Sequence, residues 1–194
     1  SIQEFNASIP WRSLTASMLL LDSHDTARFR TVVLGDKNAH LAGMTMMLTY
    51  PGVPSIFAGD ETGLEGSWGE DSRRTINWED RSQWDYEFLA EVKKLVALRK
   101  SHDALISGGL RWIAAEDDYI AYLRESKNEA LLVLISRKAI SAKIDVGTFG
   151  YSVAKTLYGK EASGQVISIK SKSATTGVWL LQNKEESPCK PETT

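Results

Sequence analysis

Two stretches of the chain carry a short apolar run that ends abruptly in acidic and imidazole side chains. Residues 19–26 read Leu-Leu-Leu-Asp-Ser-His-Asp-Thr, and residues 52–61 read Gly-Val-Pro-Ser-Ile-Phe-Ala-Gly-Asp-Glu. Apolar runs of this length indicate buried strands, and parallel α/β sheets commonly mount their chemistry at the carboxyl ends of such strands. The pattern therefore predicts two parallel strands with carboxylates gathered at one edge.

Between these runs, residues 39–48 are apolar nearly all round, which predicts a helix packed on both sides. Asp36 or Asn38 is a candidate cap for its first turn. A second helix is expected over residues 85–101, where apolar side chains recur at helical spacing. The first half of the chain is thus predicted to form a β-α-β unit followed by an amphipathic helix.

Beyond Leu105 the pattern changes to short alternating runs separated by turn residues. Runs of this kind predict a small antiparallel β-sandwich. We expect a domain boundary near residues 102–109, with one domain over 1–104, a second over 105–182 and a disordered tail over 183–194. The runs expected to be strands are 111–116, 119–125, 130–136, 142–146, 155–158, 166–169 and 177–182.

Composition narrows the choice of function. The formal net charge of the 194 residues is -2, which does not favour nucleic acid as a partner. No run of about 18 apolar residues is present, so we expect no membrane span. The single cysteine, Cys189, excludes a disulfide framework and a cysteine-based metal site, and a cytoplasmic location fits it.

The clustered acids admit more than one chemistry. Carboxylates at two adjacent strand ends could act on a glycosidic bond or hold a divalent cation. Alternatively, Asp25, Asp60 and Glu61 only cap the following helices or pair with an arginine. The candidate arginines are Arg28, Arg30, Arg73 and Arg74. His24 lies between a serine and an aspartate at a strand end, a position that favours a functional role.

The long segment 63–83 is irregular and rich in glycine, tryptophan and charge. Long loops in compact domains tend to be functional. Arg73 and Arg74 in this loop could donate hydrogen bonds to a ligand's oxygens, or they could form surface salt bridges.

Three motifs in series carry a resemblance to a known family. The segments 19–26 and 52–61, followed by Ser-Arg-Arg-Thr-Ile-Asn-Trp at 72–78, resemble the last third of an α-amylase family enzyme of glycoside hydrolase family 13. The resemblance spans about residues 15–100 and is closest to the neopullulanase, cyclomaltodextrinase and maltogenic amylase branch. It implies an α/β plus all-β chain: the C-terminal portion of a (β/α)₈ TIM barrel, followed by a small antiparallel β-sandwich.

The resemblance also implies roles for individual residues. Strands seven and eight of the barrel would lie at 18–22 and 54–58. His24 would hydrogen-bond the sugar in the cleavage subsite, and Asp25 would be the catalytic carboxylate that stabilises the transition state. Arg73 would hold sugars on the non-reducing side. By the same motifs, Asp60 and its neighbour would be structural.

Two departures from the family pattern affect the site. An alanine, Ala58, stands where the family often has a tyrosine. Gly69 stands where a loop aspartate is expected, with Glu70 and Asp71 displaced beside it. The sugar contact of that loop aspartate is therefore not carried over, whereas Arg73 itself matches the motif.

In this family, the retaining mechanism uses a nucleophilic Asp and a general-acid Glu, about 5 Å apart, on strands four and five. Those strands would lie upstream of Ser1. The expectation is a fragment of an α-glucan hydrolase that cleaves α-1,4-glucosidic bonds in maltodextrins, cyclodextrins or starch but is inactive alone. No cofactor or metal is implied. The expected partners are an α-glucan oligosaccharide or cyclodextrin, and either a second copy or the missing N-terminal part, because two barrel strands leave open edges.

Three alternatives remain open. The same family contains transglycosylases such as trehalose synthases, which these motifs do not separate from hydrolases. A non-enzymatic carbohydrate-binding or assembly module is the second, with glucan binding by residues 105–182 alone through exposed aromatic side chains. A metal site is the third, formed by Asp22, Asp25, Asp60 and Glu61. The candidate aromatic residues for the second alternative are Trp112, Tyr119, Tyr122 and Trp179.

Overall fold

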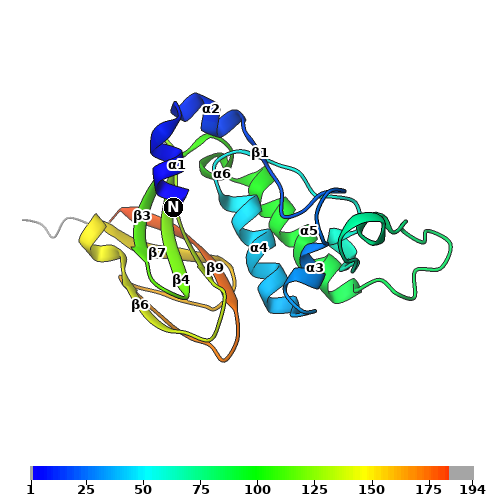
Figure 1. Cartoon of the computed structure of the whole chain (residues 1–194). Coiled ribbons are helices and arrows are strands. Elements are labelled where there is room, and N and C mark those ends of the chain that lie inside the picture. The colour runs from blue at the N-terminus through cyan, green and yellow to red at the C-terminus, as the bar shows by residue number, and fades with distance from the viewer. Residues whose placement is uncertain (1, 184–194) are drawn as a thin grey trace, which may run out of the picture.

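The computed structural model of the chain describes residues 2–183, in which helices cover one face of a five-stranded sheet and two further strands cover the other (Figure 1). The predicted tail, with Cys189, lies outside the described residues except for its first residue. The first part comprises α1 (Ile2–Ser8), α2 (Trp11–Ala16), β1 (Met18–Leu19), α3 (Phe29–Val32), α4 (Lys37–Thr49), β2 (Val53–Pro54), the 3₁₀ turns η1 (Asp60–Thr62) and η2 (Gly69–Arg73), α5 (Tyr86–Ser101) and α6 (Asp103–Ser107).

Strands β1 and β2 pair in parallel, as predicted, with Met18 opposite Val53 and Leu19 opposite Pro54. The expected extents, 18–22 and 54–58, are wrong, because each strand is only two residues long. A strand is sustained by the hydrogen bonds of its neighbours, and in the described residues each of these two strands has one neighbour. Past Pro54 the chain therefore leaves the extended ladder and enters turns.

Helix α4 lies between β1 and β2 in the sequence, and its bounds are close to the predicted 39–48. Asp36 is its N-cap: the Oδ1 atom accepts hydrogen bonds from the backbone N–H groups of Asn38 (2.8 Å) and Ala39 (3.1 Å). Gly43 lets the helix approach Phe29, since a Cβ atom there would lie 2.6 Å from the Phe29 ring. None of the described helices is long and apolar enough to cross a membrane.

All seven predicted runs fall on observed strands. The large sheet is antiparallel with the order β3-β4-β5-β9-β7, and β6 pairs with β8 in a separate antiparallel ribbon. The antiparallel strands of the second part are thereby confirmed. Their bounds are β3 (Gly109–Ala115), β4 (Tyr119–Glu125), β5 (Ala130–Ser136), β6 (Ser141–Asp145), η3 (Val146–Phe149), β7 (Tyr151–Tyr158), β8 (Val166–Lys170) and β9 (Thr175–Asn183).

The large sheet is apolar on both faces. In β5 every residue is buried. Leu131 and Val133 belong to a core shared with α4 and α5, whereas Leu132 and Leu134 belong to a core shared with β6 and β8. Side chains alternate between the faces of a strand, so a continuous apolar run marks a strand covered on both sides.

The first of these cores crosses the predicted boundary at residue 104. Leu48 of α4 and Leu95 of α5 belong to the same buried cluster as Leu131 and Val178 of the sheet. The helices and the sheet therefore stabilise each other, and the division into residues 1–104 and 105–182 stays a prediction.

Two of the aromatic side chains proposed to stack on sugars are core residues instead. Tyr122 and Trp179 are both fully buried. Tyr122 shares a hydrogen bond with Thr49 Oγ1 (2.6 Å), and the Trp179 indole N–H donates to the Lys160 carbonyl (3.0 Å). Buried aromatic rings of this kind contribute apolar area while their polar atoms stay hydrogen-bonded. The binding-module interpretation is therefore wrong for these two residues.

Two buried arginines close the C-terminal end of α4. Arg99, from α5, donates through Nη1 to the carbonyl oxygens of Leu48 (2.9 Å) and Tyr50 (3.2 Å), and through Nη2 to that of Gly52 (2.6 Å). The last carbonyl groups of a helix lack partners within the helix and carry partial negative charge. A guanidinium group is thus a natural partner for this helix end.

Arg124, from β4, contributes the second guanidinium group. It is fully buried and donates to the carbonyl oxygens of Thr49, Gly108 (2.9 Å) and Gly109 (3.2 Å). Within the described residues it forms no ion pair with a carboxylate. Arg124 therefore ties the end of α4, the turn after α6 and the large sheet together through backbone carbonyls alone.

A third buried arginine joins the loops that follow β1 and β2. Arg28 is 1% exposed and donates through Nε to the Ser72 carbonyl (2.8 Å). Its Nη1 atom lies 3.2 Å from Asp60 Oδ1, and its guanidinium carbon lies 3.9 Å from the centre of the Phe57 ring. The segments after the two strands are thus held against one buried cation.

Asp22 and Asp60 form a buried pair beside this arginine. Asp22 accepts the Phe29 backbone N–H through Oδ2, and its Oδ1 atom is buried without a conventional partner in the described part of the chain. Burial and the hydrogen bond and charge of Asp22 raise the pKa of Asp60 to about 8, although Arg28 opposes the shift. The Asp60 carboxyl therefore holds its proton to a higher pH than a free aspartate does.

His40, on α4, is a second buried titratable group, and its pKa shifts downward. Its Nδ1 atom accepts from Arg30 Nε (3.0 Å), and Arg30 in turn lies 3.4 Å from Asp85. Burial, and then the charge of Arg30, lower the pKa of His40 to about 3. The imidazole is therefore neutral in the folded chain, with Nδ1 as the acceptor.

We expect the substitution Arg124→Met to lower the free energy of unfolding by about 2–4 kcal/mol, because it leaves buried carbonyl groups without partners. Urea denaturation at pH 7 measures this. The control is Arg111→Met on the neighbouring strand, where an exposed Arg111–Glu125 pair contributes at most about 1 kcal/mol. Equal losses in the two variants would contradict the role given to Arg124.

The raised pKa of Asp60 predicts that the free energy of unfolding depends on pH. Between pH 6.5 and 8 the folded chain retains a proton on Asp60 that the unfolded chain has released, so the free energy of unfolding should fall as pH rises, by up to about 1.4 kcal/mol per pH unit. Below about pH 6.5 the depressed pKa of His40 gives a slope of opposite sign, since the unfolded chain then binds the extra proton.

Asp60→Asn should abolish the fall, since an amide does not titrate. Asp80→Asn, which changes an exposed loop carboxylate, should retain it. Urea denaturation at half-unit pH steps tests the prediction. A slope that persists unchanged in Asp60→Asn would show that another group carries it.

Candidate functional site

His24 and Asp25 lie at the tip of a tight turn that follows β1. The Ser23 backbone N–H donates to Thr26 Oγ1 (3.0 Å), and the Thr26 N–H donates back to the Ser23 carbonyl (3.2 Å). This exchange projects the two side chains into solvent, with exposed fractions of 65% for His24 and 69% for Asp25. Their Nε2 and Oδ1 atoms are 3.2 Å apart.

Arg73 reaches the same turn from the end of η2. Its Nε atom donates to the His24 carbonyl (3.1 Å), and its Nη2 atom lies 3.8 Å from Asp25 Oδ1. Its Nη1 atom also binds Glu70 Oε1 (3.1 Å). The structure thus brings all three sequence-predicted site residues together, an accessible imidazole, carboxylate and guanidinium that can hydrogen-bond a polyhydroxylated ligand.

A buried layer supports this exposed trio. Ser72 is fully buried; its carbonyl accepts from Arg28, and its hydroxyl donates to the carbonyls of Gly69 (2.8 Å) and His24 (3.4 Å). Arg28 therefore positions both loops that carry the trio. The sequence reasoning considered Arg28 only as one of several ion-pair partners. One signal in the sequence could have identified its role: acids follow both predicted strands, and acids gathered at one edge of a sheet need a cation beside them.

The acids after β2 play structural parts. Asp60 is 2% exposed and pairs with Arg28, and Glu61 Oε2 accepts the Gly59 backbone N–H (2.8 Å). The pairing interpretation holds for Asp60, whereas Glu61 binds a backbone N–H of its own turn. Across residues 2–183 no group of three or more His, Cys, Asp or Glu side chains could hold a metal ion, so the metal site proposed for Asp22, Asp25, Asp60 and Glu61 is wrong.

The structure also shows what Glu70 and Asp71 do in the loop where Gly69 replaces the expected aspartate. Glu70 takes up the pairing with Arg73, and Asp71 pairs with Arg74 Nη2 (2.7 Å). The hydrogen bond from the Ser67 backbone N–H, with that from Arg74, lowers the pKa of Asp71. The salt-bridge interpretation thus holds for Arg74, while Arg73 both forms an ion pair and contacts the turn.

Two of the exposed aromatic rings lie on the loop between β2 and α5. Trp68, directly before η2, is 72% exposed, and Trp78 is 59% exposed. The Trp78 ring lies 5.4 Å from that of Trp84, with the Arg81 guanidinium 5.0 Å from the Trp84 ring. The tryptophan-rich composition of residues 63–83 was the signal for these rings.

Comparison with known proteins places this geometry in a family. Residues 2–80 match the family model for the alpha amylase catalytic domain. A cyclomaltodextrinase from a Bacillus species is 36% identical over 132 residues, which are 67% of this chain and 24% of that enzyme. An intracellular maltogenic amylase from Bacillus subtilis is 33% identical over 61% of this chain and 20% of its own length.

A solved structure agrees with these relatives. The debranching enzyme of Nostoc punctiforme, in crystals soaked with acarbose, matches 92% of this chain and 36% of its own with a TM-score of 0.76 and 27% identity. The chain spans about a quarter of the length of the curated relatives it matches. With the three motifs folded around one turn, these matches show that the chain belongs to the α-amylase family.

Proposed function

We propose that this chain supplies part of the substrate-binding face of a retaining α-glucan hydrolase that cleaves α-1,4-glucosidic bonds in maltodextrins, cyclodextrins or starch. The observation that carries the proposal is the exposed Asp25 carboxylate, placed beside His24 and Arg73 at the ends of two parallel strands. Relatives named cyclomaltodextrinase and maltogenic amylase support it, as does a relative whose crystals were soaked with acarbose.

Each residue of the trio has a proposed role. Glycosidic cleavage passes through a transition state with positive charge on the sugar ring, and a fixed carboxylate such as Asp25 stabilises that charge as it develops. His24 hydrogen-bonds the sugar in the same subsite. Arg73, whose Nε is held by the His24 carbonyl, binds sugar hydroxyls on the non-reducing side.

The bond-breaking carboxylates of the retaining mechanism belong, in this proposal, to barrel strands outside this chain. A hollow of about 500 Å³ opens between α1, α2, β1 and α4 and is lined by apolar side chains such as Phe5, Leu14 and Met46. Met18 and Val53 on the two short strands are also more than half exposed. These apolar surfaces suit association with the rest of a (β/α)₈ barrel or with a second copy of the chain. A cytoplasmic location is proposed separately, on the ground that one relative is named an intracellular maltogenic amylase.

We expect Asp25→Asn, in the protein expressed from its complete reading frame, to lower kcat for maltotriose by about 10²–10³, the range seen when one group that stabilises transition-state charge is removed. KM should change far less, because the interaction strengthens only in the transition state. Steady-state hydrolysis of maltotriose and β-cyclodextrin measures both constants.

The matched control is Asp80→Asn, which changes an exposed carboxylate in the loop that also carries Arg73, without touching the trio. It should leave both constants within about twofold of the parent, since surface substitutions away from a site have small effects. If Asp25→Asn raised KM and spared kcat, Asp25 would be a ground-state binding residue and the proposed role would fail.

A separate expectation concerns the 194-residue chain by itself. Without a nucleophile and a general acid about 5 Å apart, it should release no glucose or maltose from maltotriose or β-cyclodextrin. Chromatography of overnight incubations is sufficient to detect residual activity. Hydrolysis that survives purification and tracks the chain would overturn the assignment of the nucleophile to another segment.

A further inference from the structure

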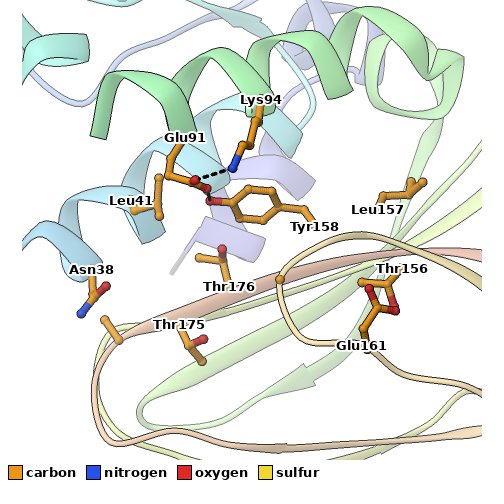
Figure 2. A pocket seen from close by; sticks show the side chains of 12 residues that line it. Asn38, Leu41, Glu91, Lys94, Thr156, Leu157, Tyr158, Glu161, Thr175 and Thr176 are labelled. Carbon is orange, nitrogen blue, oxygen red and sulfur yellow. Dashed lines mark hydrogen bonds and ion pairs between the residues drawn. The ribbon is translucent and has the colours of Figure 1, made fainter. Parts of the chain in front are cut away.

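A polar groove lies across the helices from the loops that carry the trio. It opens between α4 and α5 on one side and the β7 and β9 edge of the large sheet on the other, with a volume of about 470 Å³ (Figure 2). Cavities of this size enclose small ligands in other proteins. None of its lining residues belongs to the trio.

The groove is lined by groups that form hydrogen bonds without net positive charge. Thr156, Thr175 and Thr176 contribute hydroxyls from the two strands, and Asn38 contributes an amide from the first turn of α4 (Figure 2). Three of these groups already hold one hydrogen bond and keep further capacity: Thr156 Oγ1 accepts the Ala162 N–H (3.1 Å), Thr176 Oγ1 accepts from Thr45 (3.3 Å), and Asn38 Nδ2 donates to Ser173 (3.3 Å). The Thr175 hydroxyl forms no side-chain hydrogen bond in the described part of the chain. A buried or half-buried hydroxyl of this kind favours a ligand that offers hydroxyls in return.

The charged groups of the groove disfavour an anion. Lys94 is neutralised by Glu91, with Nζ and Oε1 2.6 Å apart. Glu161 adds a carboxylate that has no ion pair within residues 2–183. A phosphate or carboxylate ligand would therefore meet net negative charge.

One wall of the groove is aromatic and fixed in orientation. The Tyr158 hydroxyl donates to Glu91 Oε2 (2.6 Å), and burial raises the pKa of this hydroxyl, so it stays a donor (Figure 2). The next residue, Gly159, has a φ of 86°, and a Cβ atom there would lie 2.4 Å from the Thr176 carbonyl oxygen. The turn is thereby packed closely against β9, and the Tyr158 ring lies beside Thr176 (Figure 2).

The groove extends beyond this opening. A second hollow of about 500 Å³ runs along α4 and α5 and shares Asn38, Leu41 and Glu91 with the first. A ligand with more than one unit could therefore occupy both. The described lining residues offer several hydroxyls and a tyrosine ring, and their cations are paired. A neutral oligosaccharide matches such a surface, because its rings have polar edges and apolar faces.

We propose that this groove is a second carbohydrate-binding site, distinct from the cleavage site, that takes a short neutral α-glucan between the helices and the β7–β9 edge. The groove chemistry indicates a neutral oligosaccharide, and the choice of an α-glucan rests on the proposed function. Such a site would hold a substrate chain on the protein while another part of it enters the cleavage subsite, which raises the effective concentration of the cleavable bond.

The test is nuclear magnetic resonance of the protein expressed from its complete reading frame, labelled with ¹³C at threonine methyl groups and titrated with maltotriose. Asp25→Asn is introduced to slow cleavage. Signals of Thr175 and Thr176 report the groove, whereas those of Thr26 and Thr75 report the loops of the cleavage site. We expect both sets to shift, with separate saturation curves.

The double variant Asn38→Ala/Thr175→Val removes two polar groups from the groove. It should raise the Kd read from Thr176 at least tenfold and leave the Kd read from Thr26 unchanged. Thr15→Val, an exposed threonine on α2, is the matched control and should change neither.

Two results would overturn the second site. In one, only Thr26 and Thr75 shift, which would support the proposed function and leave the groove empty. In the other, the groove signals move but the double variant binds as the parent does, which would show that the shifts are transmitted from elsewhere. Shifts confined to the groove would support the second site and count against sugar binding at Asp25.

Discussion

The structure depends on carbonyl groups at the end of α4 being bound by arginines from two different layers. Arg99 reaches them from α5 and Arg124 from the large sheet, so one helix end is held by both of its neighbours. Burying a guanidinium group costs free energy unless its donors are satisfied, and here backbone carbonyls satisfy them. The position of α4 then determines where β1 and β2 can pair, and their pairing determines where the loops beyond them begin.

The candidate site repeats this principle on a smaller scale. Asp25 and His24 are largely exposed, yet the chain just after them is anchored by Arg28, which contacts Ser72 and Asp60 in the interior. Burial beside Asp22 raises the pKa of Asp60, which contacts the same buried cation. Precise binding groups are usually supported by such a layer of fixed residues.

Most of the helices and strands could be predicted from the pattern of apolar residues. The run 130–136 was predicted as a strand and the segment 39–48 as a helix because their patterns have no competing interpretation, and Asp36 capped its helix as its residue type suggested. The motifs also identified the trio, but not what supports it. The buried role of Arg28 depends on contacts between segments more than 30 residues apart, which local patterns do not encode. The two short strands were overestimated because strand length is set by neighbours.

The doubly covered strand β5 has a consequence for how such a protein can change over evolutionary time. A module that is recombined between proteins must keep its apolar surface covered in its new setting. Within the described chain, the face of β5 that carries Leu131 and Val133 shares its buried cluster with α4, α5 and α6. Gene rearrangements that separate the sheet from these helices would expose that face, so the two are expected to be inherited as one unit.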